Sequence, residues 1–374
     1  MTPYLLAFAV IAYVVHAVSL FAVAKRIRND RPVYFNCHDP DKVSVIRPLC
    51  GVEPYLFDCL VSGLRLELPI CETLFCVANA DDPAIEYAKA AMRVCPEADA
   101  RILIGDDREY TNPKLNNMSK GLKEAKHTWI LMADSNVLLP YDSFDKMRRE
   151  YTKLGAWNSI DDWAGVTSSP PIASKVYGFG SELECAFLNT YQARWQLVAD
   201  DFGHGFAQGK VMLWDRNFFQ QIGGIGALAS ESAEDAAATK ASRKADRRVN
   251  LVRVPFCQPL GRRSLLAVWK RQLRWARLRR ASFPLYFAPE LLVGGVWPAL
   301  LVLMALGPLY AIPFVALWYG TEYQIARMCK WHTSLDSIPA MVVRDLLIPV
   351  LYIAAMMGDD YEWRGTKLSV KESV

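Results

Sequence analysis

Acidic residues occupy three places in the sequence where carboxylates could act on a phosphate-bearing substrate. Asp81 and Asp82 follow one strand-like run, and Asp134 ends another in the segment Met132-Ala-Asp-Ser-Asn136. A carboxylate at the end of an apolar strand is well placed to hold a divalent cation, and oxygen ligands suit Mg²⁺ or Mn²⁺. Such a cation could bridge a diphosphate and stabilise it as it leaves. The alternative interpretation is that these acids are helix caps and loop residues, which are common after strands.

The third acidic place is Glu234-Asp235, which follows the flexible stretch Gly223-Gly-Ile-Gly226 and opens a helical run. An acid in the first turn of a helix is also favoured by the helix dipole, so a purely structural role stays open. The functional interpretation makes Asp235 the general base that takes a proton from an acceptor hydroxyl. Such a positioned base typically contributes about 10² to 10⁴ in rate.

A cationic segment follows these acids. From Arg262 to Arg280 the chain contains eight Lys or Arg residues and no acid. Apolar residues recur at helical spacing within it, at Leu266, Trp269, Leu273 and Ala276, which predicts a basic amphipathic helix at a membrane surface. Arg274 could also meet diphosphate charge at the mouth of a site, because its guanidinium fork suits phosphate oxygens. The two interpretations are compatible.

Alternating strands and helices are predicted to position these side chains. Strand-like runs are found at Val43–Leu49, Thr73–Asn79, Asp99–Gly105 and Trp129–Asp134, and helical runs near Tyr55–Leu68, Pro83–Val94 and Asn116–Lys126. This order predicts a mostly parallel sheet with helices on both faces. Ligands of such sheets gather at the carboxyl ends of the strands, where the acids lie.

An apolar run near the N-terminus is predicted to be an uncleaved membrane anchor. Residues Tyr4–Ala24 are long enough to cross a bilayer, and four basic residues follow at once, Lys25, Arg26, Arg28 and Arg31. Positive residues stay on the cytoplasmic side, so we expect the N-terminus outside and the following domain in the cytosol. A cleaved signal peptide would carry its positive charge before the apolar stretch.

Two further apolar regions, Leu285–Tyr319 and Ile338–Met357, predict two or three C-terminal spans. The second region contains Arg344 and Asp345, which could pair, snorkel, or mark a segment at the interface. The predicted organisation is therefore an anchor with its basic flank at 1–31, a catalytic domain at 40–260, an interfacial helix at 261–284, membrane segments at 285–357, and an exposed polar tail at 358–374.

Composition excludes several classes of protein. The chain has 374 residues, 52% of them hydrophobic and 22% charged, with a net charge of +4, which is too small to indicate binding of nucleic acid. Its nine cysteines form no CxxC pair and no zinc-ligand spacing. We interpret them as small buried residues in a reducing compartment.

The assembled residues resemble a known family of enzymes. Asp82, Asp134, Asp235 and the segment Arg271-Gln-Leu-Arg274-Trp275 match, in order, the D, D, D, (Q/R)xxRW pattern of family 2-like inverting glycosyltransferases. Several segments are also similar to ceramide glucosyltransferases of family 21: Asn79-Ala-Asp-Asp-Pro-Ala-Ile, Asn112-Pro-Lys-Leu-Asn-Asn117, Asp134-Ser, and Ile222-Gly-Gly. The likeness covers about Val43 to Arg280.

The resemblance implies an α/β fold of the GT-A type, with transmembrane helices before and after it. It implies that Asp81, Asp82 and Lys114 lie near the nucleotide and that Asp134 and Asn136 hold Mg²⁺ or Mn²⁺. Asp235 would be the catalytic base. Three residues of the cationic segment would serve the donor phosphate and the acceptor: Arg271, Arg274 and Trp275. The implied substrates are UDP-glucose and ceramide, and the implied product is a β-linked glucosylceramide.

The sequence departs from the family pattern in three places. A histidine near the middle of the eukaryotic enzymes falls at Gln192 here. The metal motif is Asp134-Ser-Asn136 rather than a full DxD, and residues 157–195, which we expect to face the acceptor, match poorly. A bacterial member in the inner membrane is favoured over a Golgi enzyme, and bacterial relatives also act on diacylglycerol and hopanoids. Two other functions stay open: a processive polysaccharide synthase, and a sugar-nucleotide sensor or scaffold without enzymatic activity.

Overall fold

The computed structural model describes residues 2–30, 42–66, 71–152, 163–363 and 366–369. The chain forms two compact units. The sheet unit contains Asp30–Pro171 and Ala199–Pro259, and the helical unit contains Met1–Asn29, Ile172–Val198 and Leu260–Glu372.

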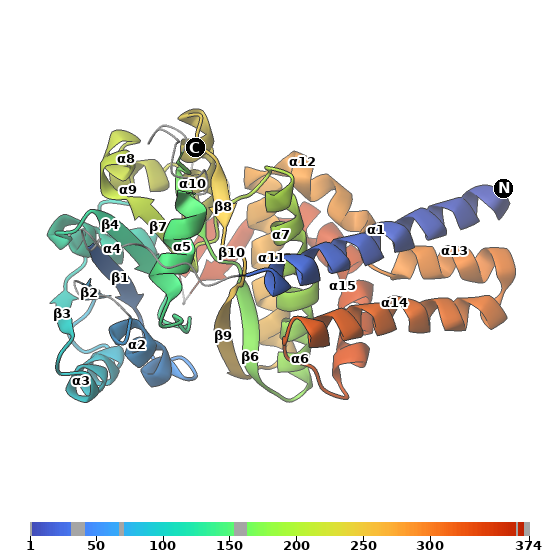
Figure 1. The fold of residues 1–374 in the computed structure, drawn as a ribbon, viewed down its shortest axis with the longest axis horizontal. Coiled ribbons are helices and arrows are strands. Elements are labelled where there is room, and N and C mark those ends of the chain that lie inside the picture. Colours follow the sequence, from blue (N-terminus) through green and yellow to red (C-terminus); the bar gives the residue numbers. More distant parts are fainter. Residues whose placement is uncertain (1, 31–41, 67–70, 153–162, 364–365, 370–374) are drawn as a thin grey trace. The chain divides into compact units, whose positions relative to one another are not determined.

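A mixed seven-stranded sheet is the centre of the sheet unit (Figure 1). Its strands are β1 (Val43–Leu49), β2 (Cys71–Val77), β3 (Asp99–Ile104), β4 (Trp129–Ala133), β5 (Val166–Ser168), β7 (Val211–Asp215) and β8 (Val249–Leu251). The strand order is β3-β2-β1-β4-β7-β5-β8, with β7 antiparallel to both its neighbours and the other pairs parallel. The predicted mostly parallel sheet is therefore confirmed, and each of the four predicted strands is found within two residues of its expected bounds.

Helices cover both faces of this sheet. They are α2 (Leu56–Leu64), α3 (Ala84–Val94), α4 (Pro113–Glu124), α5 (Ser143–Tyr151), α8 (Arg216–Gln221), α9 (Gly224–Leu228) and α10 (Glu234–Lys244). Side chains of β4 alternate between two cores: Ile130 packs with the α4 cluster, and Leu131 packs with the α5 cluster. Because alternate strand residues point to opposite faces, each face has its own hydrophobic core. The helix predicted near Tyr55–Leu68 ends at Leu64, and residues 67–70 lie outside the described part.

The helical unit combines the N-terminal helix with the C-terminal ones. Its helices are α1 (Thr2–Arg28), α6 (Phe179–Ala186), a π-helix η2 (Phe187–Ala193), the start of α7 (Arg194–Asp201), α11 (Leu265–Ser282), α12 (Pro284–Phe287), a 3₁₀ turn η3 (Ala288–Leu292), α13 (Val296–Leu306), α14 (Pro308–Met328) and α15 (Ser337–Met356). The chain crosses between the units in the paired strands β6 (Pro171–Tyr177) and β9 (Phe256–Arg262). A hairpin of β10 (Asp360–Trp363) and β11 (Thr366–Ser369) forms the tail.

Three helical segments of the described chain are long and apolar enough to cross a membrane: Pro3–Arg28, Pro284–Leu306 and Ser337–Met356. Helix α1 packs along α13 and α14 (Figure 1). The predicted basic flank of α1 includes Lys25, Arg26 and Arg28, whereas Arg31 lies outside the described residues.

The two charges inside α15 pair with each other and with a third group. Arg344 bonds Asp345 at 2.7 Å and Glu322 of α14 at 2.6 Å, and all three side chains are buried. Of the alternatives left open by the sequence, pairing is the one observed, as expected for charges inside an apolar bundle.

Helix α11 differs from the predicted amphipathic pattern. Its buried positions include Val268, Gln272 and Ala276, whereas Leu266 is 63% exposed. The buried face therefore carries a polar residue. Gln272 tolerates burial because its amide oxygen accepts a 2.8 Å hydrogen bond from Gln192.

Candidate active site

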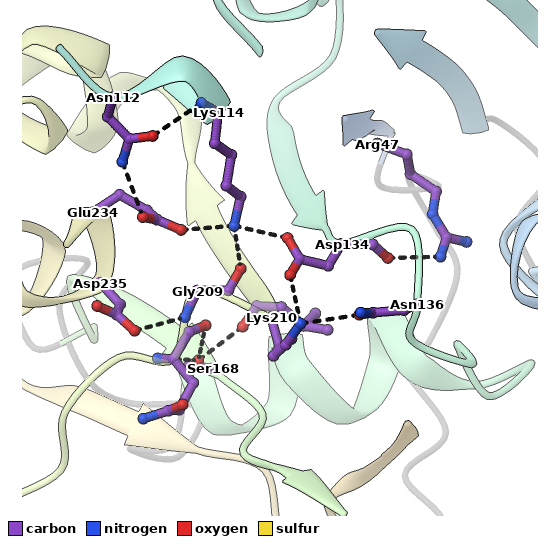
Figure 2. A network of polar contacts seen from close by, with 12 residues as sticks. Arg47, Asn112, Lys114, Asp134, Asn136, Ser168, Gly209, Lys210, Glu234 and Asp235 are labelled. Atoms are coloured by element: carbon purple, nitrogen blue, oxygen red, sulfur yellow. Dashed lines mark hydrogen bonds and ion pairs between the residues drawn. The ribbon is translucent and has the colours of Figure 1, made fainter. Parts of the chain in front are cut away.

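Asp134 lies at the carboxyl end of β4 and contacts two lysines (Figure 2). One carboxylate oxygen is 2.7 Å from Lys114 Nζ, and the other is 2.9 Å from Lys210 Nζ. Antiparallel pairing of β4 with β7 brings Lys210 here, and the Asp134 amide donates to the Lys210 carbonyl at 2.9 Å. Lys114 comes from the first turn of α4, where Asn112 caps the helix by accepting from the Lys114 amide.

The turn after Asp134 is held by buried polar side chains. Asn136 accepts from Lys210 Nζ at 3.0 Å and donates to Glu53 at 2.6 Å. The fully buried Arg47 of β1 donates to the carbonyls of Asp134 and Val137 at 2.8 and 2.9 Å. These bonds fix the backbone of the turn, so the Asp134 carboxylate is oriented by its surroundings.

The start of α10 joins the same network. Lys114 Nζ lies 2.6 Å from Glu234 and donates to the Gly209 carbonyl at 2.7 Å. The Gly209 amide donates to Asp235 at 3.1 Å, and the Ala236 amide donates to the other Asp235 oxygen at 2.8 Å. The structure thus brings Asp134 and Asp235 to one place, through Lys114 and Gly209 (Figure 2).

Gly209 packs closely against the side-chain ends of Glu234 and Lys114. A Cβ atom at this position would lie 2.5 Å from a carboxylate oxygen of Glu234 and 3.5 Å from Lys114 Nζ. A side chain would therefore displace the ion pair between Glu234 and Lys114.

The network gives its two central acids opposite pKa shifts. Burial raises the pKa of Asp134, but the charges of Lys114 and Lys210 outweigh burial and leave that pKa well below its usual value. For Asp235, burial and the nearby charge of Glu234 raise the pKa to about 6, although bonds from Gly209 and Ala236 and the charge of Lys114 oppose the rise. Asp134 is therefore a permanent anion, and Asp235 is an acid that ionises near neutral pH, as suits a general base.

The metal-binding capacity of the site is limited to a few oxygen atoms. Asp134 and Asn136 supply a carboxylate and an amide oxygen, but the lysines already bond both Asp134 oxygens. No cluster of three His, Cys, Asp or Glu side chains in the described residues could hold a metal ion. An ion at Asp134 would have to displace a lysine and take further oxygen ligands from a bound phosphate.

The other predicted site residues lie elsewhere. Asp82 accepts from the Ala84 amide at 2.8 Å and from the Gly51 amide at 3.0 Å, so it joins the start of α3 to the loop after β1. Asp81 beside it is exposed. Among the contacts described, neither joins the Lys114 network.

The residues of the predicted (Q/R)xxRW motif belong to α11 in the helical unit. Arg271 contacts the buried Glu184 of α6 at 3.1 Å, and Trp275 packs against a cluster that includes Leu188 and Leu260. Arg274 lies on the same helix.

Sequence reasoning missed three residues that build the site, Lys210, Arg47 and Gly209. Arg47 did leave a signal, because it is the one charged residue in the strand-like run Val43–Leu49. Lys210 directly precedes the apolar strand β7, but nothing local indicates that this strand pairs with β4. The pairing joins Lys210 to a residue 76 positions away.

The comparison with protein families decides the identity of the chain. The model of glycosyl transferase family 21 matches residues 4–373. The chain belongs to glycosyltransferase family 21. The resemblance found in the sequence is therefore confirmed, and the protein is a glycosyltransferase.

Named relatives and a solved structure agree with this family assignment. The glycosyltransferase is 25% identical to ceramide glucosyltransferase 1 of Caenorhabditis elegans, over 97% of this chain and 78% of the relative. It is 24% identical to ceramide glucosyltransferase 3 of the same organism, over 86% and 71%. A mannosyltransferase from Pyrobaculum calidifontis, solved with GDP-Man and Mn²⁺, superposes with a TM-score of 0.52 at 14% identity, over 96% of this chain and 98% of the other. This likeness supports the expected GT-A fold.

Proposed function

We propose that this glycosyltransferase moves glucose from UDP-glucose to ceramide with inversion at the anomeric carbon. The named relatives are ceramide glucosyltransferases and align along most of the chain, which supports the choice of donor sugar and acceptor. The observation that carries the mechanism is the position of Asp235. Its carboxylate, with a pKa raised to about 6, lies in the network that also holds Asp134.

The proposed reaction is a single displacement. The acceptor hydroxyl oxygen attacks the anomeric carbon, and Asp235 takes the hydroxyl proton as the new bond forms. The bond between the anomeric carbon and the diphosphate oxygen breaks on the opposite side, and UDP leaves with that electron pair. A carboxyl with a pKa of about 6 is mostly ionised at pH 7, so it can accept the proton without a prior deprotonation step.

The oxygen atoms of Asp134 and Asn136 would fit Mg²⁺ or Mn²⁺ once a lysine is displaced from them and the donor diphosphate completes the ligand set. Mg²⁺ commonly uses only one or two carboxylates together with substrate phosphates. When bound, the ion would neutralise charge on the leaving diphosphate. Lys114 and Lys210 hold the Asp134 carboxylate between them, and each adds a positive charge at the same place.

The remaining proposed roles come from the family resemblance found in the sequence. Asp81 and Asp82 are proposed to lie near the nucleotide, and three α11 residues are proposed to serve the donor phosphate and the acceptor: Arg271, Arg274 and Trp275. The three candidate spans and the basic end of α1 support an integral membrane protein with the sheet unit in the cytosol. A bacterial inner membrane is the proposed location.

Donor and acceptor are tested together. Purified protein in lipid nanodiscs is incubated with Mg²⁺ or Mn²⁺ and UDP-glucose, UDP-galactose or UDP-GlcNAc, against ceramide or diacylglycerol, and lipids are analysed by mass spectrometry. We expect one hexose on ceramide from UDP-glucose. Product on diacylglycerol alone would reject the acceptor, a polymer would indicate a processive synthase, and no product in any arm would reject the proposal.

A further inference from the structure

Lys210 occupies the place between the two side chains that the family resemblance assigns to a metal ion (Figure 2). Its Nζ lies 2.9 Å from one carboxylate oxygen of Asp134 and 3.0 Å from the amide oxygen of Asn136. A positively charged group therefore already joins the two oxygens. A divalent ion at the same point would need each oxygen to approach by about 1 Å, because Mg²⁺ binds oxygen at about 2.0–2.1 Å.

The surroundings keep both oxygens directed at this point. The Glu53 carboxylate can only accept hydrogen bonds, so its 2.6 Å contact with the Asn136 amide nitrogen leaves the amide oxygen facing Lys210. Arg47 donates to the Asp134 carbonyl at 2.8 Å, which holds the backbone of the same turn. Outer contacts of this kind orient the ligands of metal ions in proteins. The place of the ammonium is therefore built to hold a cation.

Lys210 is the more readily displaced of the two lysines at Asp134. The Nζ of Lys114 uses all three of its donors on oxygens at 2.6–2.7 Å, which belong to Asp134, Glu234 and Gly209. The Nζ of Lys210 has two contacts in the described part of the chain, both of them longer. An ion at this point would take both partners of Lys210, whereas Lys114 would keep Glu234 even if it lost Asp134.

The side chain of Lys210 can move while its backbone stays in place. Its carbonyl accepts from the Asp134 amide at 2.9 Å, beside the paired strands β4 and β7, so the backbone is fixed at the edge of the site. The ammonium is carried on a flexible four-carbon stem, and the side chain is 18% exposed. Once displaced, the ammonium would lie near a divalent ion and would be repelled by it unless an anion lay between them. A diphosphate held by the same ion is such an anion.

We propose that Lys210 is a donor-binding residue that gives up its place between Asp134 and Asn136 to Mg²⁺ or Mn²⁺ and then contacts the donor diphosphate. The lysine and the ion compete for the same two oxygens, and the diphosphate relieves this competition because it binds both cations. Binding of the ion and of the nucleotide is therefore coupled, and such coupling is reciprocal. The inference rests on the proposed function for the choice of a nucleoside diphosphate donor.

The competition is tested by titrating Mn²⁺ into the full-length protein in phosphatidylcholine nanodiscs without nucleotide, with free Mn²⁺ measured by electron paramagnetic resonance. Lys210→Met removes the competing cation and should bind Mn²⁺ at least about tenfold more tightly than the wild type. Lys210→Gln should do the same, and its amide can still donate to Asp134 and Asn136, so it keeps the contacts of the turn. The matched control Lys89→Met removes an exposed lysine that lies 2.9 Å from Glu86, and it should leave the affinity for Mn²⁺ unchanged. No gain in affinity in either Lys210 variant would overturn the proposal.

The donor contact is tested with UDP at saturating Mn²⁺ by isothermal titration calorimetry. UDP should bind at least about tenfold more weakly to both Lys210 variants than to the wild type, as expected for the loss of a hydrogen bond between charged groups. Lys89→Met should bind UDP like the wild type. Unchanged affinity for UDP in the Lys210 variants would overturn the role of Lys210 at the donor. Neither titration needs sugar transfer, so a wrong sugar or acceptor in the proposed function would appear separately, as a different product beside the expected titrations.

Discussion

Replacing Asp235 by Asn should abolish most activity and at the same time stabilise the sheet unit. The variant removes the proposed base, so turnover should fall by about 10²- to 10⁴-fold. The gain in stability follows from the pKa of Asp235, which rises from 3.8 to about 6 in the folded state. An acid whose pKa is raised by folding destabilises the fold wherever it is ionised, because the unfolded chain holds that charge at lower cost.

The size of this destabilisation follows from the difference between the pKa of Asp235 in the unfolded and folded states. At about 1.4 kcal/mol per pH unit, the difference between 3.8 and about 6 corresponds to about 3 kcal/mol at pH 7. Asp235 accepts two backbone hydrogen bonds, from the amides of Gly209 and Ala236, and Asn can accept only one of them. The lost hydrogen bond reduces the gain in stability by about 1 kcal/mol. The net gain of about 2 kcal/mol should raise the melting temperature by about 4–8 °C.

The destabilisation by Asp235 should increase with pH, because it is caused by the ionised form of the carboxyl. The destabilisation by Asp235 is absent below pH 3.8, grows as pH rises, and is complete above about pH 6. At pH 5 it should be about half its value at pH 7, so the advantage of Asp235→Asn should shrink there. Turnover of the wild type should fall as pH drops through about 6, where Asp235 becomes protonated.

Turnover is measured by lipid mass spectrometry and stability by thermal unfolding in detergent at pH 5 and 7. Asp215→Asn is the matched control, because Asn can still cap α8 through the Phe218 amide. Wild-type turnover in Asp235→Asn would refute the role as base. A lower melting temperature at pH 7 would refute the reasoning on burial and charge.

Three further predictions follow from the contacts. Glu234→Gln removes a charge that raises the pKa of Asp235, so the acid limb of the normalised pH–rate profile should move to lower pH. Lys114→Met removes a charge that lowers this pKa, so the same limb should move to higher pH. Shifts in the same direction in both variants would contradict the network. Gly209→Ala should reduce turnover at least about tenfold, because its Cβ meets Glu234 at 2.5 Å, and unchanged kinetics would show that this packing is not needed. Arg344→Met leaves the buried acids Glu322 and Asp345 without their cation, so it should lower the free energy of unfolding by about 3–5 kcal/mol, seen as a lower melting temperature. The control Arg327→Met changes an exposed arginine and should alter the melting temperature little. Equal effects of the two variants would contradict the buried pairing.

Local patterns in the sequence were sufficient to predict the strands of the parallel half of the sheet. Strands β1 to β4 are short apolar runs separated by helical segments, so their type and order could be predicted. Asp134 was recognisable because it ends a strand whose residues are all apolar. The start of α10 was equally visible, because acids in a first helical turn follow a glycine-rich stretch.

Contacts between distant segments could not be predicted in this way. The antiparallel pairing of β4 with β7 depends on the whole sheet, and it supplies Lys210. Lys114 was associated with the nucleotide by resemblance, but its bridge between Asp134 and Glu234 requires α4 and α10 to meet. The segment Ile172–Val198 was expected within the catalytic domain, and the structure packs it with the C-terminal helices, because its apolar side chains face α11 and α15. Residues 157–162 of the expected acceptor-facing stretch lie outside the described part.

The anomeric configuration of the product tests the central claim most directly. Asp235 is proposed to activate the acceptor hydroxyl for a single displacement at the sugar. Glucosylceramide made by the purified protein from UDP-glucose, whose glucose is α-linked, should be β-linked in the proton NMR spectrum, with the large H1–H2 coupling of that anomer. An α-linked product would require retention of configuration, and it would contradict a mechanism in which Asp235 acts as the base of one direct displacement.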